Sequence, residues 1–510
     1  MKNIFYTILS LIFAVSANAQ LINDGASIII EDGATLYIEG ALQNNTTGSI
    51  DIQGTGIVEV EGDVTIAGTS TVTMSNTAKI ILSGPNASNV TSGGATFTNV
   101  EMDKTANNVS LMDEMRISND LNFVGDNNKI LIGDNNLVFA PSATITSADD
   151  NEFIVADGDA NTGVVSKELS ANEVFTFEVG DATNYTPLNA DVTGTGYSSA
   201  TVDVNVVPME HPNRPLEAVD FISRYWNIDE TGITNFSADL IGTYVNGDLT
   251  GTAGNVNGAF FTTDWSYDNS SNGANTVTGT IAESGDFSGT NKFGRVDMKL
   301  FLHGAFDSGT SEMTNLLNLE TDALTSPYDN SVSVAASIFS SNPDIVDWVD
   351  LELRSSSAAA DIISNHSAFV KQDGSIVGLD GVSLPLLANA PNTAFVVIRH
   401  RNHLAIMTDA TIALTGAIPA LDFTDNSAGT FGANAQFDLG GGFFGMISGE
   451  ANGDGTVNAV DKNSFWRVQN GAAYDYLTST ADFNMDGTVN AVDKNAYWRL
   501  TNSLTTNVPN

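Results

Sequence analysis

The chain has 510 residues, 42% of them apolar, and 61 acidic against 19 basic side chains give it a formal net charge of -42. This excess of negative charge excludes nucleic acid as a partner and favours divalent cations. The absence of cysteine excludes a disulfide framework and thiolate chemistry. Abundant glycine (46 residues) with only 16% charged residues is typical of turn-rich β structure.

The first residues, MKNIFYTILSLIFAVSANAQ, have the pattern of an export signal. Lys2 supplies a positive start, residues 4–15 are mostly apolar, and Ala17-Asn18-Ala19 is a small-x-small cleavage pattern. We expect residues 1–19 to be a signal peptide and the mature chain to be secreted, extracellular or at the cell surface. A membrane anchor or a first core strand is the less favoured alternative. No later stretch is apolar over a spanning length, so we expect no transmembrane segment in the mature chain.

Residues 20–158 are predicted to form a β-solenoid, similar to a parallel β-helix. The stretch ASIIIEDGATLYIEG and those after it alternate apolar and polar residues in short runs, with Gly, Asn or Asp between the runs. Evenly spaced short strands are typical of stacked turns. A β-sandwich is the alternative. Polysaccharide lyases share the solenoid architecture, but Lys79, Lys104, Arg116 and Lys129 are the only basic candidates that residues 21–158 offer for a lyase base.

Residues 159–295 carry longer strands and more aromatic side chains, which predicts one or two antiparallel β-sandwich domains. Pro208, Pro212 and Pro215 mark a loop, because proline interrupts the hydrogen bonding of a continuous sheet. Trp226 and Trp265 are candidate sugar-stacking platforms. We favour a role as core anchors, because large aromatic side chains are mostly buried in sandwiches.

Residues 296–440 contain the stretches KLFLHGAFDSGTSEMTNLL, NPDIVDWVDLELRSS and AFVVIRHRNHLAIMT. These stretches resemble a module common in secreted surface proteins of Bacteroidetes, which is often described as adhesin-like or haemagglutinin-like. The resemblance implies a β-sandwich module of surface proteins. It implies no chemistry for individual residues.

The same region holds the side chains most suggestive of catalysis. His400 and His403 are three residues apart, so on one continuous strand they point to opposite faces and share a metal only if the strand ends between them. Asp347, Asp350 and Glu352 lie on an earlier predicted strand, and the last two share a face, as a glycosidase pair would. We favour a structural role for all of them, and we predict no catalytic residue.

Near the C-terminus the sequence GTVNAVDKN occurs twice, at Gly455–Asn463 and Gly487–Asn495. Each copy lies in a twelve-residue pattern of carboxylate, amide and carbonyl oxygens around a glycine turn, which predicts a calcium loop. The predicted ligands are Glu450, Asn452, Asp454, the Thr456 carbonyl, Asn458 and Asp461 in loop one, and Asp482, Asn484, Asp486, the Thr488 carbonyl, Asn490 and Asp493 in loop two. We therefore expect two Ca²⁺ ions. Each loop should lead into a short helix, and the two units should pack together to bury their aromatic faces.

These duplicated loops resemble the dockerin module, which binds cohesin modules and attaches secreted proteins, often polysaccharide-degrading enzymes, to a scaffold. The resemblance implies a small α-helical calcium-binding domain at residues 441–510, with a cohesin-like or other surface protein as partner. Two positions depart from the dockerin pattern. Glu450 stands where Asp is usual, and Ala459-Val460 and Ala491-Val492 stand where a Ser-Thr pair is frequent. The apolar pairs favour a different partner surface, or one used against the preceding domain.

Together these features predict a mainly β protein with an N-terminal solenoid, sandwich domains and a dockerin-like end. The favoured function is a secreted, non-catalytic, adhesin-like interaction protein. Its β domains would contact a matrix, with extracellular polysaccharide as a candidate ligand. The alternative is a polysaccharide-degrading enzyme, either a glycoside hydrolase or a polysaccharide lyase, or an accessory protein carried by the dockerin-like module.

Overall fold

The computed structural model describes residues 19–509, apart from 126, 216–217, 268–273, 415–417, 419 and 426. The signal-peptide prediction falls almost wholly outside the described residues. The chain is mainly β, with 46% strand and 9% helix. It divides into two compact units, Met1–Asn291 and Lys292–Asn510. Within the described residues, no helix is long and apolar enough to cross a membrane.

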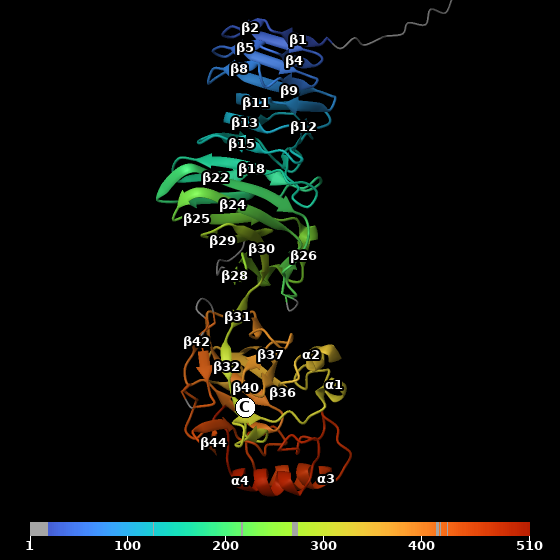
Figure 1. The fold of residues 1–510 in the computed structure, drawn as a ribbon, viewed down its shortest axis with the longest axis vertical. Helices are drawn as coiled ribbons and strands as arrows, with labels where there is room; N and C mark the ends of the chain where they lie inside the picture. The colour runs from blue at the N-terminus through green and yellow to red at the C-terminus, as the bar shows by residue number, and fades with distance from the viewer. Residues whose placement is uncertain are drawn as a thin grey trace, which may run out of the picture. The chain divides into compact units, whose positions relative to one another are not determined.

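The first unit begins with a β-solenoid of about seven turns, as the sequence predicts (Figure 1). Its strands stack in parallel on three sheets. The first sheet contains β1 (Leu21–Asp24), β4 (Leu42–Asn45), β7 (Val64–Ile66), β10 (Ser88–Thr91), β12 (Val109–Leu111), β14 (Ile130–Leu131), β17 (Ile154–Val155) and β20 (Val179–Gly180). The second contains β2 (Ser27–Ile30), β5 (Ser49–Ile52) and β8 (Thr71–Met74). The solenoid part of the third contains β3 (Thr35–Ile38), β6 (Ile57–Val60), β9 (Lys79–Gly84), β11 (Thr96–Lys104), β13 (Met115–Phe123), β15 (Leu137–Phe139), β16 (Thr144–Thr146) and β18 (Val165–Leu169).

The alternation of apolar and polar residues explains why these strands stack. Along β5, Ile50 and Ile52 are buried while the alternating residues Ser49 and Asp51 are partly exposed. The parallel register places Val58 of β6 beside Ile80 of β9, so buried side chains of successive turns lie directly over one another. A turn between strands needs glycine at Gly62, where a Cβ atom would lie 2.7 Å from the backbone of the turn before.

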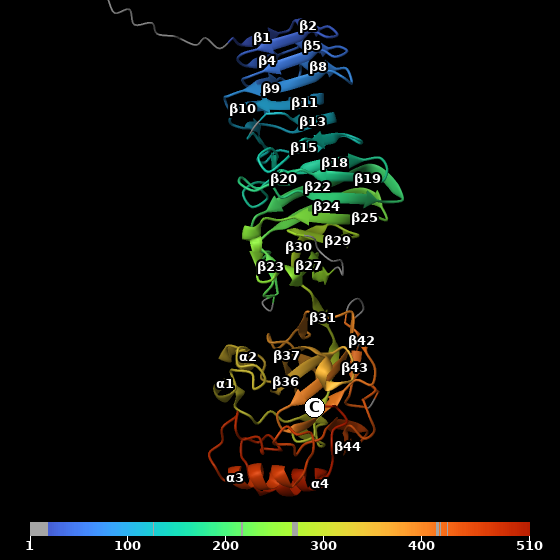
Figure 2. The ribbon, with the colours of Figure 1, turned by 180° about the vertical axis from the view of Figure 1, so that it is seen from behind.

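The third sheet continues without a break from the solenoid into antiparallel structure (Figure 2). Strand β18 pairs in parallel with β15 on one side and antiparallel with β22 on the other. The remaining strands of this sheet are β22 (Gly196–Val207), β23 (Phe221–Ile222), β24 (Tyr225–Thr234), β26 (Leu249–Thr250), β27 (Val256–Phe261), β28 (Trp265–Tyr267) and β30 (Gly285–Asn291). A separate antiparallel sheet contains β19 (Glu173–Phe177), β21 (Leu188–Thr193), β25 (Ser237–Thr243) and β29 (Thr276–Ile281). One hydrophobic core runs through both parts of the unit, from Ile30 to Phe287.

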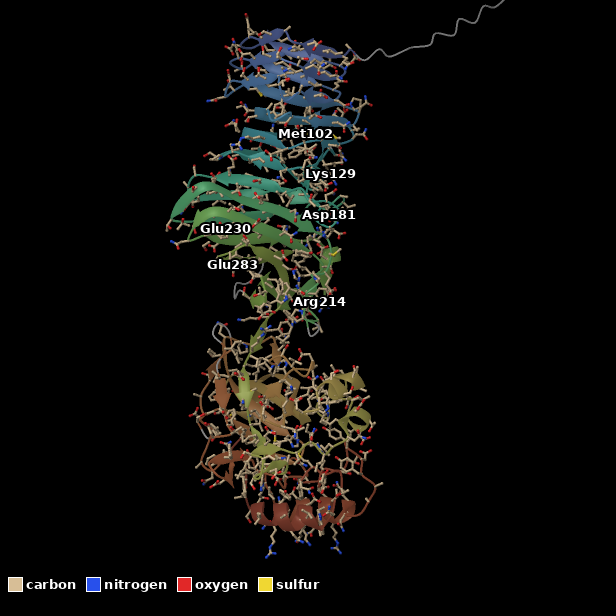
Figure 3. The ribbon with its side chains drawn as sticks, in the orientation of Figure 1. Met102, Lys129, Asp181, Arg214, Glu230 and Glu283 are labelled. Atoms are coloured by element: carbon tan, nitrogen blue, oxygen red, sulfur yellow. The ribbon has the colours of Figure 1, made fainter. Side chains whose placement is uncertain are left out.

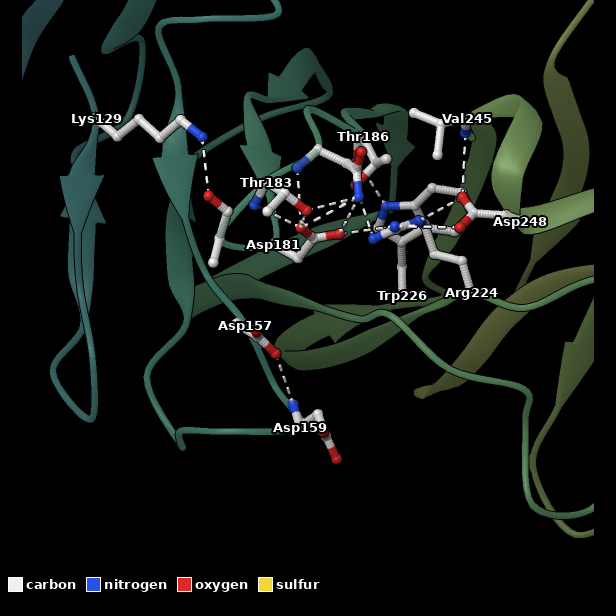
Figure 4. Close-up of polar contacts among 12 residues, drawn as sticks. Lys129, Asp157, Asp159, Asp181, Thr183, Thr186, Arg224, Trp226, Val245 and Asp248 are labelled. Carbon is white, nitrogen blue, oxygen red and sulfur yellow. Dashed lines mark hydrogen bonds and ion pairs between the residues drawn. The ribbon is translucent and has the colours of Figure 1, made fainter. Parts of the chain in front are cut away.

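A buried ion triad joins the end of the solenoid to the antiparallel strands (Figure 4). The Arg224 side chain is 1% exposed; its Nη2 lies 2.7 Å from Asp181 Oδ2 and its Nε lies 2.8 Å from Asp248 Oδ2. Beside it, Trp226 Nε1 donates to the Thr186 carbonyl at 2.9 Å. Asp181, also labelled in Figure 3, follows the last strand of the first sheet, so the triad ties segments distant in sequence.

The second unit is built around a mixed set of short sheets and a central antiparallel sheet. The central sheet contains β36 (Ile345–Arg354), β37 (Ile362–Lys371), β38 (Ile376–Val377), β40 (Thr393–His400), β41 (His403–Met407) and β42 (Ile412–Ala413). The smaller sheets pair β31 (Phe293–Arg295) with β39 (Leu386–Ala388), β32 (Asp297–Lys299) with β43 (Ala420–Asp422), β34 (Phe306–Asp307) with β35 (Glu312–Met313), and β33 (Phe301–Leu302) and β44 (Phe437–Gly440) with β45 (Phe443–Met446).

The helices of the chain are short and occur mainly in the second unit. The α-helices are α1 (Leu319–Asp322), α2 (Ala336–Ser341), α3 (Arg467–Gln469) and α4 (Arg499–Thr501). Two π-helical segments are η4 (Asp461–Trp466) and η5 (Asp493–Trp498). The 3₁₀ turns are η1 (Asn246–Asp248), η2 (Ala253–Asn255) and η3 (Ala359–Asp361). Helix η4 continues directly into α3, and η5 into α4.

Replacing the triad's arginine should destabilise the first unit strongly. In Arg224→Met the Asp181 and Asp248 carboxylates lose their buried cation, so we expect the free energy of unfolding to fall by about 3–5 kcal/mol. Urea denaturation followed by tryptophan fluorescence measures this change. The control is Lys79→Met, because Lys79 is 33% exposed in its pair with Glu101 and should cost less than about 1 kcal/mol. Equal losses in the two variants would contradict the role of the triad.

Candidate metal centre

The two predicted calcium loops lead into two helices that pack on one another, as expected from the repeat. Helical residues 459–469 follow loop one and residues 491–501 follow loop two, and the two helices contact each other through η4 and η5, with α3 and α4 at opposite ends of the pair (Figures 1 and 2). The two units exchange equivalent hydrogen bonds. Trp466 Nε1 donates to the Asn490 carbonyl at 2.6 Å, and Trp498 Nε1 donates to the Asn458 carbonyl at 2.9 Å. The repeat therefore builds a pair of loop–helix units that share one interface.

In loop one the carboxylates accept hydrogen bonds from the loop backbone. The buried Asp461 accepts from the backbone N–H of Ala451 at 2.8 Å and of Asn458 at 2.7 Å. Glu450 Oε1 accepts from the Gly453 N–H at 2.8 Å. The second oxygen, Glu450 Oε2, is buried with no hydrogen-bond partner. A buried carboxylate oxygen without a partner costs free energy, so this atom is suited to receive a cation.

Loop two repeats the contacts of the last carboxylate and differs at the first one. Asp493 accepts from the Asn490 N–H at 2.7 Å, as Asp461 does from Asn458. Asp482 Oδ2 accepts from the Gly487 N–H at 3.0 Å. Here the oxygen without a partner is Asn484 Oδ1, at the third position of the loop.

Burial and mutual repulsion make the charged state of these carboxylates unfavourable. Burial, with the nearby Asp461 charge, raises the pKa of Glu450 to about 7. Burial also raises the pKa of Asp482 to about 7, with a contribution from Asp493, and burial raises the pKa of Asp493 to about 6. A cation bound in each loop would lower the pKa values of that loop's carboxylates and offset the cost of burying their charges.

The oxygen set of each loop fits calcium in its chemistry. Carboxylate, amide and carbonyl oxygens are the ligands that Ca²⁺ prefers. Two of them, Glu450 Oε2 and Asn484 Oδ1, are buried without a partner. The carboxylates are nevertheless engaged by the loop backbone, and in the described part of the chain no three His, Cys, Asp or Glu side chains converge as a ready-made metal site. Binding an ion would therefore require these side chains to turn away from the backbone groups they now bind.

A buried polar network connects the segment between the two predicted calcium loops to the central sheet. The Asp347 carboxylate, on β36, accepts from Arg401 Nε at 3.1 Å and from the Tyr476 hydroxyl at 2.5 Å, and its Oδ2 lies 3.2 Å from His400 Nε2. Burial opposes the charge of Asp347, but Arg401 and His400 outweigh burial and lower its pKa to about 2. Tyr476 lies between the two loops in sequence. Sequence reasoning missed this contact, and the only signal for it was the pair of tyrosines in that connecting segment.

The two histidines lie together, because the strand ends between them. Strand β40 ends at His400 and β41 begins at His403, which is the exception that the strand argument allowed. Their Nδ1 atoms are 3.0 Å apart. Burial lowers the pKa of both rings, and His403 Nε2 accepts from the Gly304 N–H at 3.1 Å. Both rings are thus held inside the unit by hydrogen bonds to protein groups.

The carboxylate pair Asp350 and Glu352 is buried rather than placed at an open site. Glu352 is bound by the Arg354 and Arg399 guanidinium groups. Asp350 Oδ2 accepts from Asn365 Nδ2 at 2.8 Å, and burial raises the pKa of Asp350 to about 6. Both carboxylates are thus bound by side chains of the central sheet.

The two tryptophan candidates of the first unit differ in exposure. Trp226 is completely buried, with its ring 6.0 Å from that of Phe287, as expected of a core anchor. Trp265 is half-buried, with its ring 4.8 Å from that of His211, and its Nε1 donates to the Asn213 carbonyl at 2.8 Å.

The basic side chains considered for a lyase base are all engaged in structural contacts. Lys79 pairs with Glu101, Lys104 donates to the Ser83 carbonyl, Arg116 pairs with Glu168, and Lys129 donates to the Ala182 carbonyl. Lys129 is labelled in Figures 3 and 4. Lys104 is completely buried, and burial lowers its pKa to about 8.

Comparison with known proteins found no relative of this chain. No family, no curated protein and no solved structure matches the chain.

Proposed function

We propose that the chain is an exported, non-catalytic attachment protein whose dockerin-like, calcium-binding end binds a partner protein. The observation that carries this proposal is that the two loop–helix units expose apolar and basic side chains at equivalent positions. In one unit Val460 and Val468 are 43% and 70% exposed, and in the other Val492 and Leu500 are 47% and 62% exposed. Exposed apolar side chains that recur on packed units are typical of an interaction surface.

Basic side chains accompany this surface, which we call the paired helix face: Val460, Arg467, Val468, Val492, Arg499 and Leu500. Arg467 and Arg499 are exposed, and neither forms an ion pair with another described residue. The rest of the chain is strongly acidic. Charge complementarity therefore favours a partner protein whose surface is apolar with acidic residues around it.

Calcium would act by stabilising the loops on which this face is built. The oxygens without partners at Glu450 and Asn484 support two ions, one in each loop. The loops and helices share an interface through Trp466 and Trp498, so an ion in one loop would support both helices. Ion binding would thus maintain the face that binds the partner.

The β structure would display this end and contact a matrix, with extracellular polysaccharide as a candidate ligand. The four-stranded sheet and the antiparallel part of the long sheet contribute to one core, which supports a sandwich in residues 159–295. Export is supported by the signal-like pattern of residues 1–19. For the alternative, a polysaccharide-degrading enzyme, the buried and paired state of Asp350 and Glu352 offers no support.

Calcium titration tests the metal proposal on the mature chain, residues 20–510. We expect two bound ions, and we expect Asp461→Ala and Asp493→Ala each to remove one, because each carboxylate is the last ligand of its loop. Isothermal titration calorimetry with CaCl₂ counts the ions, and Asp438→Ala, an exposed aspartate outside the loops, is the control. An unchanged ion count in both loop variants would reject the assignment.

Stabilisation by calcium should weaken as the pH falls. The raised pKa values of Glu450, Asp482 and Asp493 mean that protons bind these carboxylates as the pH drops through about 7 to 6, where they compete with the ion. Without calcium, protonation relieves the repulsion and stabilises the fold, because the folded-state pKa values lie above the unfolded ones. The difference in melting temperature between calcium and chelator should therefore shrink from pH 8 to pH 5.5. A difference that is constant over this range would contradict the mechanism.

The partner proposal predicts calcium-dependent retention of a secreted protein on the paired helix face. The double variant Val460→Asp and Val492→Asp should abolish this retention, because it adds negative charge and removes apolar surface facing an acidic partner. The matched control is Val382→Asp, since Val382 is 70% exposed in the same unit and lies outside the face. Pull-down from the native secretome, with calcium and with chelator, gives the measurement. Equal retention by the double variant and the wild type would exclude this face.

A further inference from the structure

The turn between β40 and β41 contacts the entry of both calcium loops. This turn consists of Arg401 and Asn402, and Asn402 is completely buried. The Asn402 carbonyl accepts from the N–H of Gly449, the residue before loop one, at 3.2 Å. The Asn402 side-chain Nδ2 donates to the backbone carbonyl of Asp482, the first residue of loop two, at 2.5 Å. One residue of the central sheet thus binds two segments of the calcium region that are distant in sequence.

A chain of hydrogen bonds fixes the orientation of the Asn402 amide. The Gly304 N–H donates to His403 Nε2 at 3.1 Å, so this nitrogen carries no proton and the ring proton lies on Nδ1. His403 Nδ1 lies 2.7 Å from Asn402 Oδ1, which must then accept this proton. The amide nitrogen is left to face Asp482, where it can only donate. The buried histidine therefore selects the rotamer in which Asn402 holds loop two.

The backbone of loop two is confined on a further side. At Gly304 a Cβ atom would lie 1.9 Å from the carbonyl oxygen of Phe483, the second residue of the loop. No other residue type fits there without moving the loop. The start of loop two is thus held between the Gly304 backbone and the Asn402 amide.

We propose that Asn402 is a positioning residue that sets the entry of loop two for calcium, an inference that rests on the proposed calcium function. Asp482 is the first predicted ligand of loop two, and its side chain begins at the backbone that Asn402 fixes. Groups that orient metal ligands typically contribute about 10–100-fold to metal affinity. Loop one depends on the backbone carbonyl of Asn402, which any substitution retains. The effect of a side-chain change should therefore be confined to loop two.

Calcium affinity of each loop, measured separately in the mature chain, tests this asymmetry. Asn402→Ala and the nearly isosteric Asn402→Asp are each placed in the Asp461→Ala background, which leaves loop two, and in the Asp493→Ala background, which leaves loop one. Calorimetry with CaCl₂ should show loop-two affinity lower by about 10-fold or more in both Asn402 variants. Loop-one affinity should stay within about three-fold, since its contact is to the backbone. The control is Asn495→Ala, the same chemical change at an exposed amide on the helix after loop two.

The outcomes separate this inference from the proposed function. A parent chain that binds no calcium rejects both. A parent chain that binds two ions, with loop-two affinity unchanged in Asn402→Asp, rejects the positioning role alone. Equal losses at both loops also reject it, because they indicate general destabilisation of the unit. Far-UV circular dichroism of each variant at saturating calcium measures folding, and Asn402→Asp keeps the acceptor for His403 should the alanine variant fail to fold.

Discussion

The structure of the first unit depends on the parallel register of short strands. A strand such as β5 buries only two side chains on its inward face, too few to stabilise a turn of chain in isolation. Stacking in direct register places each of these side chains over its equivalent in the next turn, so every turn completes the core of its neighbour. The last turn of the stack would otherwise leave the edge of its strand without a hydrogen-bonding partner. In the third sheet, the antiparallel strand β22 pairs with this edge of β18, and the hydrophobic core continues into the antiparallel part.

In the second unit, the structure depends on how the small loop–helix region is attached to the central sheet. Its loop–helix pair has a small hydrophobic core of its own, and other side chains of this region, such as Met485 and Tyr476, join cores built mainly by the sheets. Buried polar contacts add direction to this packing. Asp347, Arg401 and Asn402 each have partners that only one placement of the loops can satisfy. Polar networks of this kind contribute specificity, because a shifted arrangement leaves buried groups without partners.

The sequence predicted features that depend on local pattern. The alternation in residues 20–158 predicted the solenoid, and the aromatic residues of the two repeats predicted the packing of the units. Features that depend on contacts between distant segments could not be predicted from the sequence. The ion triad joins Asp181, Arg224 and Asp248, which no spacing rule connects. The contact between His400 and His403 depends on where one strand ends, and strand boundaries are what sequence patterns predict least reliably. No sequence pattern pointed to Asn402, because its role depends on contacts with Gly449 and Asp482, which are distant in sequence.

The orientation of the long sheet gives the first unit a direction-dependent response to mechanical load. Hydrogen bonds between neighbouring strands run across the strands, which in the solenoid means along the stacking direction. Tension along that direction is carried by all the inter-turn interfaces in series. The weakest interface therefore opens first, while the others stay intact. Extension would then proceed in steps of one turn. At the buried Arg224 triad, tension would instead meet charge pairs that must separate inside a core, so the stepwise lengthening would end there.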